Sequence, residues 1–295
     1  MTGNKIANLK RRSELLRAIR SGFYRSFFVE VETPVRIPAP APEEYIESIR
    51  AEGEFLRTSP ELAMKVLLAD GMERIFQIGS AFRAGEHGWK HREEFTILEY
   101  YATGWNYREL AEFTAALLQD AAREIFGTPV LEWRDRQLDF SDVSFITVDE
   151  AYRRYAGVSA FTSDQDGSFD ELMVTCVEPN LGSRGLEFLI DYPASRASLA
   201  RLAPDRRVAE RWELYAAGIE LGNAFGELTC AAEQRARFAA ALEFRARAGM
   251  HPYPEATDFL SALDRGLPES SGCAIGFDRL AMLFCDAQEI GDVRA

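Results

Sequence analysis

Residues 74–101, RIFQIGSAFRAGEHGWKHREEFTILEYY, decide the fold, because two strand-like runs flank a charged loop. The pattern predicts a β-hairpin. Period-2 alternation in the returning strand places aromatic rings, a carboxylate and a phenol on one face, that of Phe95, Ile97, Glu99 and Tyr101. Such a face is suited to a small polar ligand with an aromatic ring.

Cationic side chains lie beside this face. Arg83 ends the first strand, and His91 and Arg92 lie in the loop. Guanidinium forks bind phosphate, and Phe95 offers a ring for a purine to stack on, so the hairpin is a candidate nucleotide site. A surface hairpin with a solvated, charged loop would have the same composition, and the hairpin alone does not decide between the two.

Residues 210–228, ERWELYAAGIELGNAFGEL, predict a second hairpin. If Ala217-Gly218 is its two-residue turn, Glu213 and Glu220 fall on one face at a diagonal of roughly 7 Å. Two carboxylates at such a short distance repel each other unless a cation lies between them. Mg²⁺ is the cation expected beside a nucleotide. Exposed hairpin acids without a partner are the alternative interpretation.

Residues 270–283, SSGCAIGFDRLAML, predict a short strand that breaks into a helix. Gly272 and Gly276 bracket the strand, and Asp278 and Arg279 lie in the first helical turn. A helix N-terminus with an adjacent arginine can hold an anion. Steps of this kind are also common in cores, and the sequence has neither a GxxxxGK[ST] nor a GxGxxG phosphate loop.

The remaining sequence fits one domain without internal repeats. A helix is expected through about residue 24, and residues 27–34, FFVEVETP, alternate like a strand. Residues 36–45 are proline-rich and predict a loop, whereas residues 156–185 are the least regular part of the chain and a candidate insertion. Further helices are predicted at 59–71, 107–126 and 231–249.

Composition excludes several classes of protein. The 295 residues are 47% hydrophobic, as in a globular protein. No apolar run approaches the roughly 18 to 20 residues of a membrane span, so we expect a cytoplasmic protein without membrane contact. The four cysteines form no CxxC pair, which argues against structural zinc and a disulfide framework. A net charge of −13 argues against stable binding of nucleic acid.

Taken in order, these stretches resemble the motifs of class II aminoacyl-tRNA synthetases, and FFVEVETPV resembles the family's first motif at the dimer interface. The lysyl branch is the most similar, through TSPELAMKVLL, HREEFTILEYY and GIELGNAFGELT. The resemblance implies an α+β fold in which an antiparallel β-sheet is flanked by helices. It also implies one catalytic domain over residues 1–295 and a homodimer.

Lysyl-tRNA synthetases carry an N-terminal OB-fold that reads the anticodon, whereas here the first motif begins by residue 30. We therefore expect no anticodon-binding domain. Residues 191–202, DYPASRASLARL, and Ala274 resemble the EpmA (PoxA, GenX) family, which attaches (R)-β-lysine to a lysine side chain of translation elongation factor P. The resemblance implies an AMP-forming ligase that uses ATP, Mg²⁺ and (R)-β-lysine or lysine, with elongation factor P as its partner. Another acceptor (a tRNA, a carrier protein or a small molecule) and a non-catalytic synthetase paralogue stay open.

The resemblance also assigns roles to residues. Arg83 and Arg279 would be catalytic through their contacts with the phosphates, and Glu213 and Glu220 would bind the metal. The second motif usually reads Arg-x-Glu, so Glu86 is displaced by one residue, and the sequence leaves open whether it serves. The ATP site would comprise Arg83, Glu86, His91, Arg92, Phe95, Glu220, Leu221, Gly276 and Arg279. The amino-acid site would comprise Ser59, Pro60, Glu61, Glu99, Tyr101, Asn223, Glu227 and Ala274.

Overall fold

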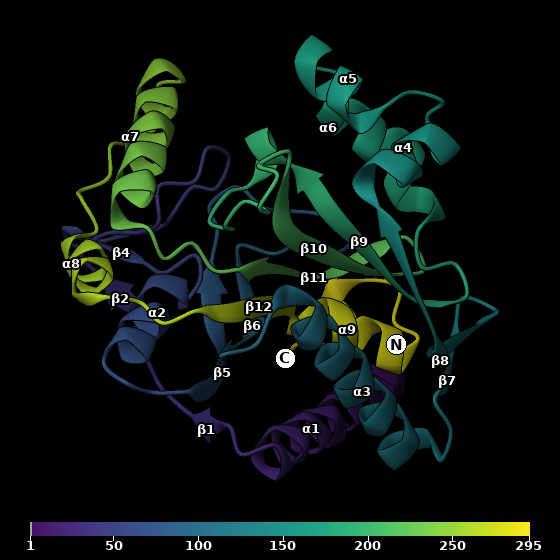
Figure 1. Ribbon diagram of the computed structural model, residues 1–295. Coiled ribbons are helices and arrows are strands. Elements are labelled where there is room, and N and C mark those ends of the chain that lie inside the picture. Colours follow the sequence, from purple (N-terminus) through teal and green to yellow (C-terminus); the bar gives the residue numbers. More distant parts are fainter. Residues whose placement is uncertain (1) are drawn as a thin grey trace.

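The protein is built on a nine-stranded β-sheet (Figure 1). The computed structural model describes residues 2–295, with the side chains of residues 4–295. In the order in which they pair, the strands are β1 (Val29–Glu30), β5 (Arg74–Phe82), β6 (Glu94–Thr103), β12 (Ser270–Gly276), β11 (Ile219–Gly226), β10 (Val208–Ala216), β9 (Gly185–Pro193), β8 (Arg136–Thr147) and β7 (Val130–Trp133). Neighbouring strands are antiparallel except for β1 with β5 and β8 with β9. The expected α+β fold with a mostly antiparallel sheet is confirmed.

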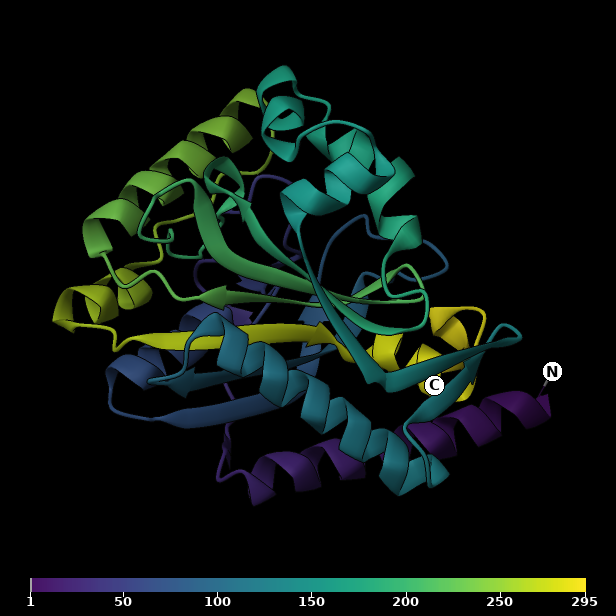
Figure 2. The same cartoon turned by 45° about the vertical axis from the view of Figure 1, so that its right-hand side comes forward.

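Three helices cover one face of the sheet and bury the main core (Figures 1 and 2). They are α1 (Thr2–Arg25), α3 (Tyr107–Phe126) and α9 (Phe277–Cys285). Leu98 and Tyr100 of β6 are buried in this core, as the alternation predicts. A capping box of Asn106 and Glu109 begins α3, and Gly127, with a φ of 74°, ends it. The opposite face of the sheet is therefore left for the functional side chains.

Two groups of elements flank that opposite face of the sheet (Figure 2). The first group is a three-stranded sheet and three helices: β2 (Arg36–Ile37), β4 (Glu54–Leu56), β3 (Arg50–Ala51), α2 (Glu61–Ala69), α7 (Ala231–Arg247) and α8 (Thr257–Arg265). A hydrophobic cluster that includes Met64, Phe238 and Phe259 holds α2, α7 and α8 together.

The second group is a run of short helices. It comprises α4 (Val148–Tyr155), α5 (Ala160–Asp166), α6 (Phe169–Leu172), a π-helical turn (Met173–Val177) and a 3₁₀ turn (Glu178–Asn180). These elements have their own hydrophobic cluster, in which Tyr152 and Phe169 pack with Tyr192 of β9 and Tyr215 of β10. The irregular sequence of residues 156–185 thus folds as a helical segment anchored on the sheet.

Most of the predicted elements are confirmed, including both hairpins, the four helices and the final strand-to-helix step. The strand predicted over residues 27–34 is mostly wrong, since only Val29–Glu30 forms a strand. Phe27 has a φ of 62°, so the chain leaves α1 through a left-handed turn before any pairing begins. No helix within residues 2–295 is long and apolar enough to cross a membrane.

Candidate active site

Four adjacent strands bring four of the predicted site residues into one row. Glu99 of β6 lies opposite Ala274 of β12, which lies opposite Asn223 of β11. Asn223 lies opposite Glu213 of β10. Directly paired side chains share a face of a sheet, so residues from three separate stretches of sequence form one floor. Ala274 occupies the middle of that floor, between Glu99 and Asn223.

A second row, parallel to the first, consists of Tyr101, Gly272, Phe225 and Arg211. A Cβ atom on Gly272 would lie 2.1 Å from the Tyr101 ring and 2.7 Å from a carboxylate oxygen of Glu227. Contacts that short are not tolerated, so glycine at 272 is what allows Tyr101 and Glu227 to approach each other over the strand.

A cleft of about 690 Å³ lies over this floor. Loop residues 41–46, residues 194–199 and α7 contribute to its walls. Most of the predicted site residues line it: Ser59, Glu61, Arg83, Glu86, His91, Arg92, Phe95, Glu213, Glu220, Leu221, Asn223, Ala274, Gly276 and Arg279. The other predicted residues lie outside this lining: Glu99, Tyr101 and Glu227 are buried, and Pro60 caps the start of α2.

Arg83 lies at one end of the cleft with an unsatisfied guanidinium nitrogen. Its guanidinium lies 5.1 Å from the centre of the Phe95 ring, and its Nη1 lies 3.7 Å from a carboxylate oxygen of Glu86. The displaced acid of the second motif therefore still lies within reach of Arg83. The Nε atom of Arg83 is buried and has no hydrogen-bond partner within residues 2–295. A buried cationic donor without a partner fits an anionic ligand such as a phosphate.

His91 and Arg279 form a second basic group at this end. Arg279 donates to Nε2 of His91 at 2.7 Å and to a carboxylate oxygen of Glu220 at 3.1 Å. Burial and the Arg279 charge lower the pKa of His91 to about 4, so its imidazole is neutral at pH 7. Arg279 is thus the cation of this group, whereas His91 orients it. The loop conformation around His91 is held by Arg92, which donates to the carbonyl of Gly88 at 2.6 Å.

The paired acids of the second hairpin lie on either side of a β-bulge. The Ala217-Gly218 turn and the pairing of Tyr215 with Glu220 are confirmed, but a β-bulge follows between Leu214 and Tyr215. Glu213 consequently lies opposite Asn223, farther along the strand than regular pairing would place it. Both acids line the same cleft, and the short diagonal from Glu213 to Glu220 stays a prediction.

Asp278 does not belong to the anion site that the sequence suggested at the start of α9. It is 1% exposed and accepts hydrogen bonds from the amide of Thr96 and from Arg12 and Arg294, each at 2.8 Å. These bonds satisfy its carboxylate. Asp278 therefore fixes the helix start, and Arg279 is the residue of this turn that supplies a cation to the cleft.

At the other end of the cleft floor, Glu99 accepts hydrogen bonds from Ser59 Oγ at 2.6 Å and from the Tyr101 hydroxyl at 2.5 Å. Burial, followed by the nearby Glu61 charge, raises the pKa of Glu99 to about 8. Glu99 is thus mostly protonated at pH 7 until a cation lies beside it.

Lys65, which sequence reasoning missed, supplies a buried positive charge among the acids. Its Nζ lies 2.5 Å from a carboxylate oxygen of Glu61 and 2.5 Å from one of Glu227. The side chains of Lys65 and Glu227 are 2% and 1% exposed. The signal was a single lysine in the apolar helix SPELAMKVLL, four residues after Glu61. Three carboxylic acids with one lysine leave this end of the cleft with excess negative charge.

Arg211 was also missed, although it precedes Glu213 by only two residues. Its guanidinium donates to Glu213 at 2.6 Å and to the side-chain oxygen of Asn223 at 3.2 Å. It also lies 4.2 Å from the centre of the Tyr192 ring. Arg211 therefore links a predicted metal ligand to a predicted amino-acid ligand.

The chain matches the family model of class II tRNA synthetases (D, K and N) over residues 2–295. It is 37% identical over 308 residues to the elongation factor P–(R)-β-lysine ligase of Pectobacterium atrosepticum, covering 98% of this chain and 94% of that protein. The ligase of the same name from Vibrio cholerae is 36% identical over 315 residues, with 98% and 95% covered. That of Proteus mirabilis is 35% identical over 308 residues, with 98% and 94% covered. The chain therefore belongs to the class II tRNA synthetase family, and within it to the elongation factor P–(R)-β-lysine ligases.

Proposed function

We propose that this protein is an ATP-dependent ligase that adenylates (R)-β-lysine and transfers it to a lysine side chain of elongation factor P. The observation that carries the proposal is the division of one cleft into a basic end, at Arg83 and Arg279, and an acidic end, at Glu61 with the buried Glu99 and Glu227 beside it. A nucleotide triphosphate suits the first end and a diamino acid suits the second. The names of the relatives pair (R)-β-lysine with elongation factor P, which agrees with a diamino acid at the second end.

In the first step, the amino-acid carboxylate attacks the α-phosphate of ATP, forming an acyl-adenylate and releasing pyrophosphate. Negative charge develops on the phosphate oxygens, and fixed guanidinium groups stabilise it. We assign the α-phosphate to Arg83, whose Nε lacks a partner, and the outer phosphates to Arg279. Phe95 stacks on adenine, and Glu86 is placed to contact the nucleotide or the amino-acid amine.

Mg²⁺ fits the carboxylates of Glu220 and Glu213. Burial raises the pKa of Glu220, but the charge and hydrogen bond of Arg279, together with the charges of Arg83 and Lys90, outweigh burial and lower the pKa overall, so this carboxylate is ionised. Within residues 2–295 no group of three or more His, Cys, Asp or Glu side chains is arranged to hold a metal ion. Mg²⁺ commonly binds one or two carboxylates together with substrate phosphates, which is the arrangement proposed here. The ion would neutralise phosphate charge.

The acidic end would hold the two ammonium groups of the substrate. Lys65 forms ion pairs with both Glu61 and Glu227, so its single positive charge does not neutralise the two carboxylates. The remaining negative charge, together with the Glu99 carboxyl group, attracts a second cation. Ser59 and Asn223 lie beside these acids and offer hydrogen bonds. A neutral analogue would leave buried acids without a countercharge, which discriminates against it by several kcal/mol.

Amino-acid binding is expected to release a proton near pH 7 and to tighten as the pH rises. Glu99 holds a proton below its pKa of about 8, and a bound ammonium group favours the carboxylate. The apparent Kd should therefore fall by up to about tenfold per pH unit below that pKa and level off above it. Calorimetry in buffers with different ionisation enthalpies counts the protons. Unchanged proton release in Glu99→Gln would contradict the assignment.

In the second step, the lysine amine of elongation factor P attacks the acyl carbon, and AMP leaves with the electrons of the broken acyl–phosphate bond. Incubating the protein with labelled (R)-β-lysine, ATP, elongation factor P and tRNA tests this function. We expect label on the factor and hardly any on tRNA. Label on tRNA alone would preserve adenylation but overturn the acceptor.

The same assay, run with (R)-β-lysine and with α-lysine, tests which amino acid the protein prefers. Ala274 adds a methyl group between Glu99 and Asn223, where α-lysine and β-lysine differ in the position of one amine. One methylene is worth about 1 to 3 kcal/mol in a pocket, so (R)-β-lysine should be activated roughly tenfold or more better than α-lysine. Ala274→Gly should reduce the preference for (R)-β-lysine over α-lysine.

We further propose a cytoplasmic homodimer that associates through the region of the first motif. Tyr24, Phe27, Val29 and Val35 are exposed around this region, and a second copy would cover them.

A further inference from the structure

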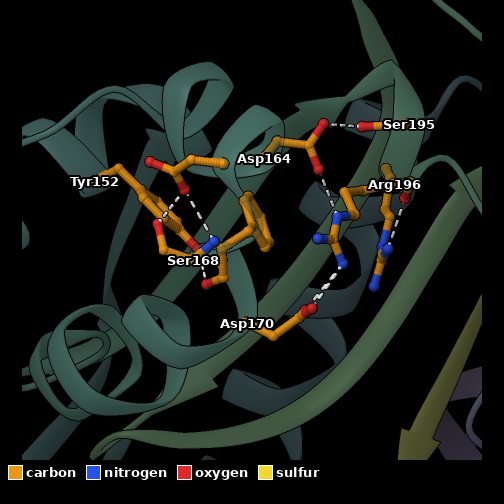
Figure 3. Close-up of polar contacts among 9 residues, drawn as sticks. Tyr152, Asp164, Ser168, Asp170, Ser195 and Arg196 are labelled. Carbon is orange, nitrogen blue, oxygen red and sulfur yellow. Dashed lines mark hydrogen bonds and ion pairs between the residues drawn. The ribbon is translucent and has the colours of Figure 1, made fainter.

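Arg196 ties the helical segment of residues 156–185 to the cleft wall (Figure 3). Arg196 lies at the end of the 3₁₀ turn Ala194–Arg196. Its Nε donates to Asp164 of α5 at 2.8 Å, and its Nη1 donates to both carboxylate oxygens of Asp170 of α6 at 3.0 Å. Ser195 also donates to Asp164.

Packing reinforces these hydrogen bonds. The Arg196 guanidinium lies 4.6 Å from the centre of the Phe169 ring. The Arg196 side chain is 25% exposed and that of Asp164 18%, so water screens this ion pair only in part, whereas the Asp170 side chain is 67% exposed. A planar fork that bonds two acids and stacks on a ring fixes direction as well as charge. Arg196 is therefore held by α5 and α6 together.

The backbone of Arg196 connects the contacts with α5 and α6 to the cleft. Its carbonyl accepts a hydrogen bond from Arg211 Nη1 at 2.8 Å. The other nitrogens of Arg211 donate to Glu213 and Asn223. Glu213 has a second donor, the Tyr215 hydroxyl at 2.7 Å. Within residues 2–295, the Asn223 side-chain oxygen accepts its hydrogen bond from Arg211 alone.

We infer that Arg196 is a positioning residue that couples the helical segment to the amino-acid end of the cleft through Arg211 and Asn223. Residues 194–199 form part of the cleft wall, and Asp170 also lines the cleft. When the bonds from α5 and α6 are lost, the wall loses its anchor and Arg211 loses a fixed acceptor. Asn223 is then free to rotate, whereas Glu213 keeps its bond to Tyr215. The inference rests on the proposed function, because Asn223 is assigned there to the amino acid.

The test compares the KM values for (R)-β-lysine and for ATP in pyrophosphate exchange. Asp164→Asn changes a residue outside the cleft lining, and Arg196→Lys keeps the charge but loses the fork. Both should raise the KM for the amino acid about fivefold or more and change the KM for ATP less than twofold. The matched control is Arg184→Ala, which removes an ion pair to Asp142 at 3.2 Å from a guanidinium that is 81% exposed. It should behave like the wild type.

Hydrogen exchange of the same variants gives a second readout that needs no substrate. Peptides covering residues 194–200 and 208–226 should exchange faster in Asp164→Asn and Arg196→Lys than in Arg184→Ala. Unchanged exchange and unchanged KM would overturn the coupling, and so would equal rises in both KM values. If the wild-type protein showed no amino-acid-dependent activity, the proposed function would fail, while faster exchange would still support the coupling.

Discussion

Replacing Arg83 with alanine is expected to lower amino-acid-dependent exchange of pyrophosphate into ATP by about 10²-fold or more. Arg83 is partly buried, its Nε has no partner, and it lies at the basic end of the cleft. A donor fixed before the reaction stabilises the charge that develops at the α-phosphate, and losing one such donor typically costs about 10²- to 10³-fold in rate. The measurement is exchange of labelled pyrophosphate at saturating ATP and (R)-β-lysine.

The control for this experiment is Arg123→Ala. Arg123 pairs with Asp120 on α3 at 3.3 Å, on the other side of the sheet from the cleft. It should retain wild-type exchange. Arg83→Lys separates charge from geometry, because lysine keeps the positive charge but cannot reproduce the fork. Full activity of Arg83→Ala would remove Arg83 from the site and would weaken the whole assignment of the basic end.

Replacing Lys65 with methionine is expected to destabilise the fold by about 3–5 kcal/mol. The substitution leaves the buried carboxylate of Glu227 without its cation, and Glu61 loses the same partner. Removing one member of a buried ion pair typically costs that much. Urea denaturation with and without the substitution measures the free energy of unfolding.

The pH dependence of this loss distinguishes charge from packing. Without Lys65, the folded-state pKa of Glu227 is raised further above its unfolded value, so the native state binds more protons than the unfolded state. Stability then falls as the pH rises through that range. The deficit of Lys65→Met should therefore be larger at pH 8 than at pH 5.5. The double variant Lys65→Met/Glu227→Gln should recover much of the loss at pH 8. A deficit that does not change with pH would indicate lost packing alone.

The sequence predicted the elements of the site better than it predicted their contacts. Alternation along β6 placed Glu99 and Tyr101 on one face, and the Ala217-Gly218 turn set the start of the second hairpin, because both depend on neighbours along the chain. The β-bulge between Leu214 and Tyr215 has no strong local signal, so the sequence did not predict that Glu213 pairs with Asn223.

Contacts between distant parts of the chain were the other gap. Glu61 and Lys65 are one helical turn apart, but nothing in the sequence shows that Glu227 joins them. The sequence also did not reveal that residues 156–185 fold as a helical segment. Its helices are short and polar outside, and their core is completed by Tyr192 and Tyr215 of the sheet. Tertiary packing therefore decides this segment more than local propensity does.

The position of β12 has a consequence for how the protein is made. This strand lies between β6 and β11, yet β6 ends at Thr103 and β12 begins at Ser270. A chain leaving the ribosome from its N-terminus therefore exposes the edge of β6 until residues 270–276 have emerged. An open strand edge invites pairing with other chains, and closing it late requires contacts of high sequence separation. We therefore expect the nascent chain to need protection of this edge, and the cleft floor can form only once residues 270–276 are available to pair.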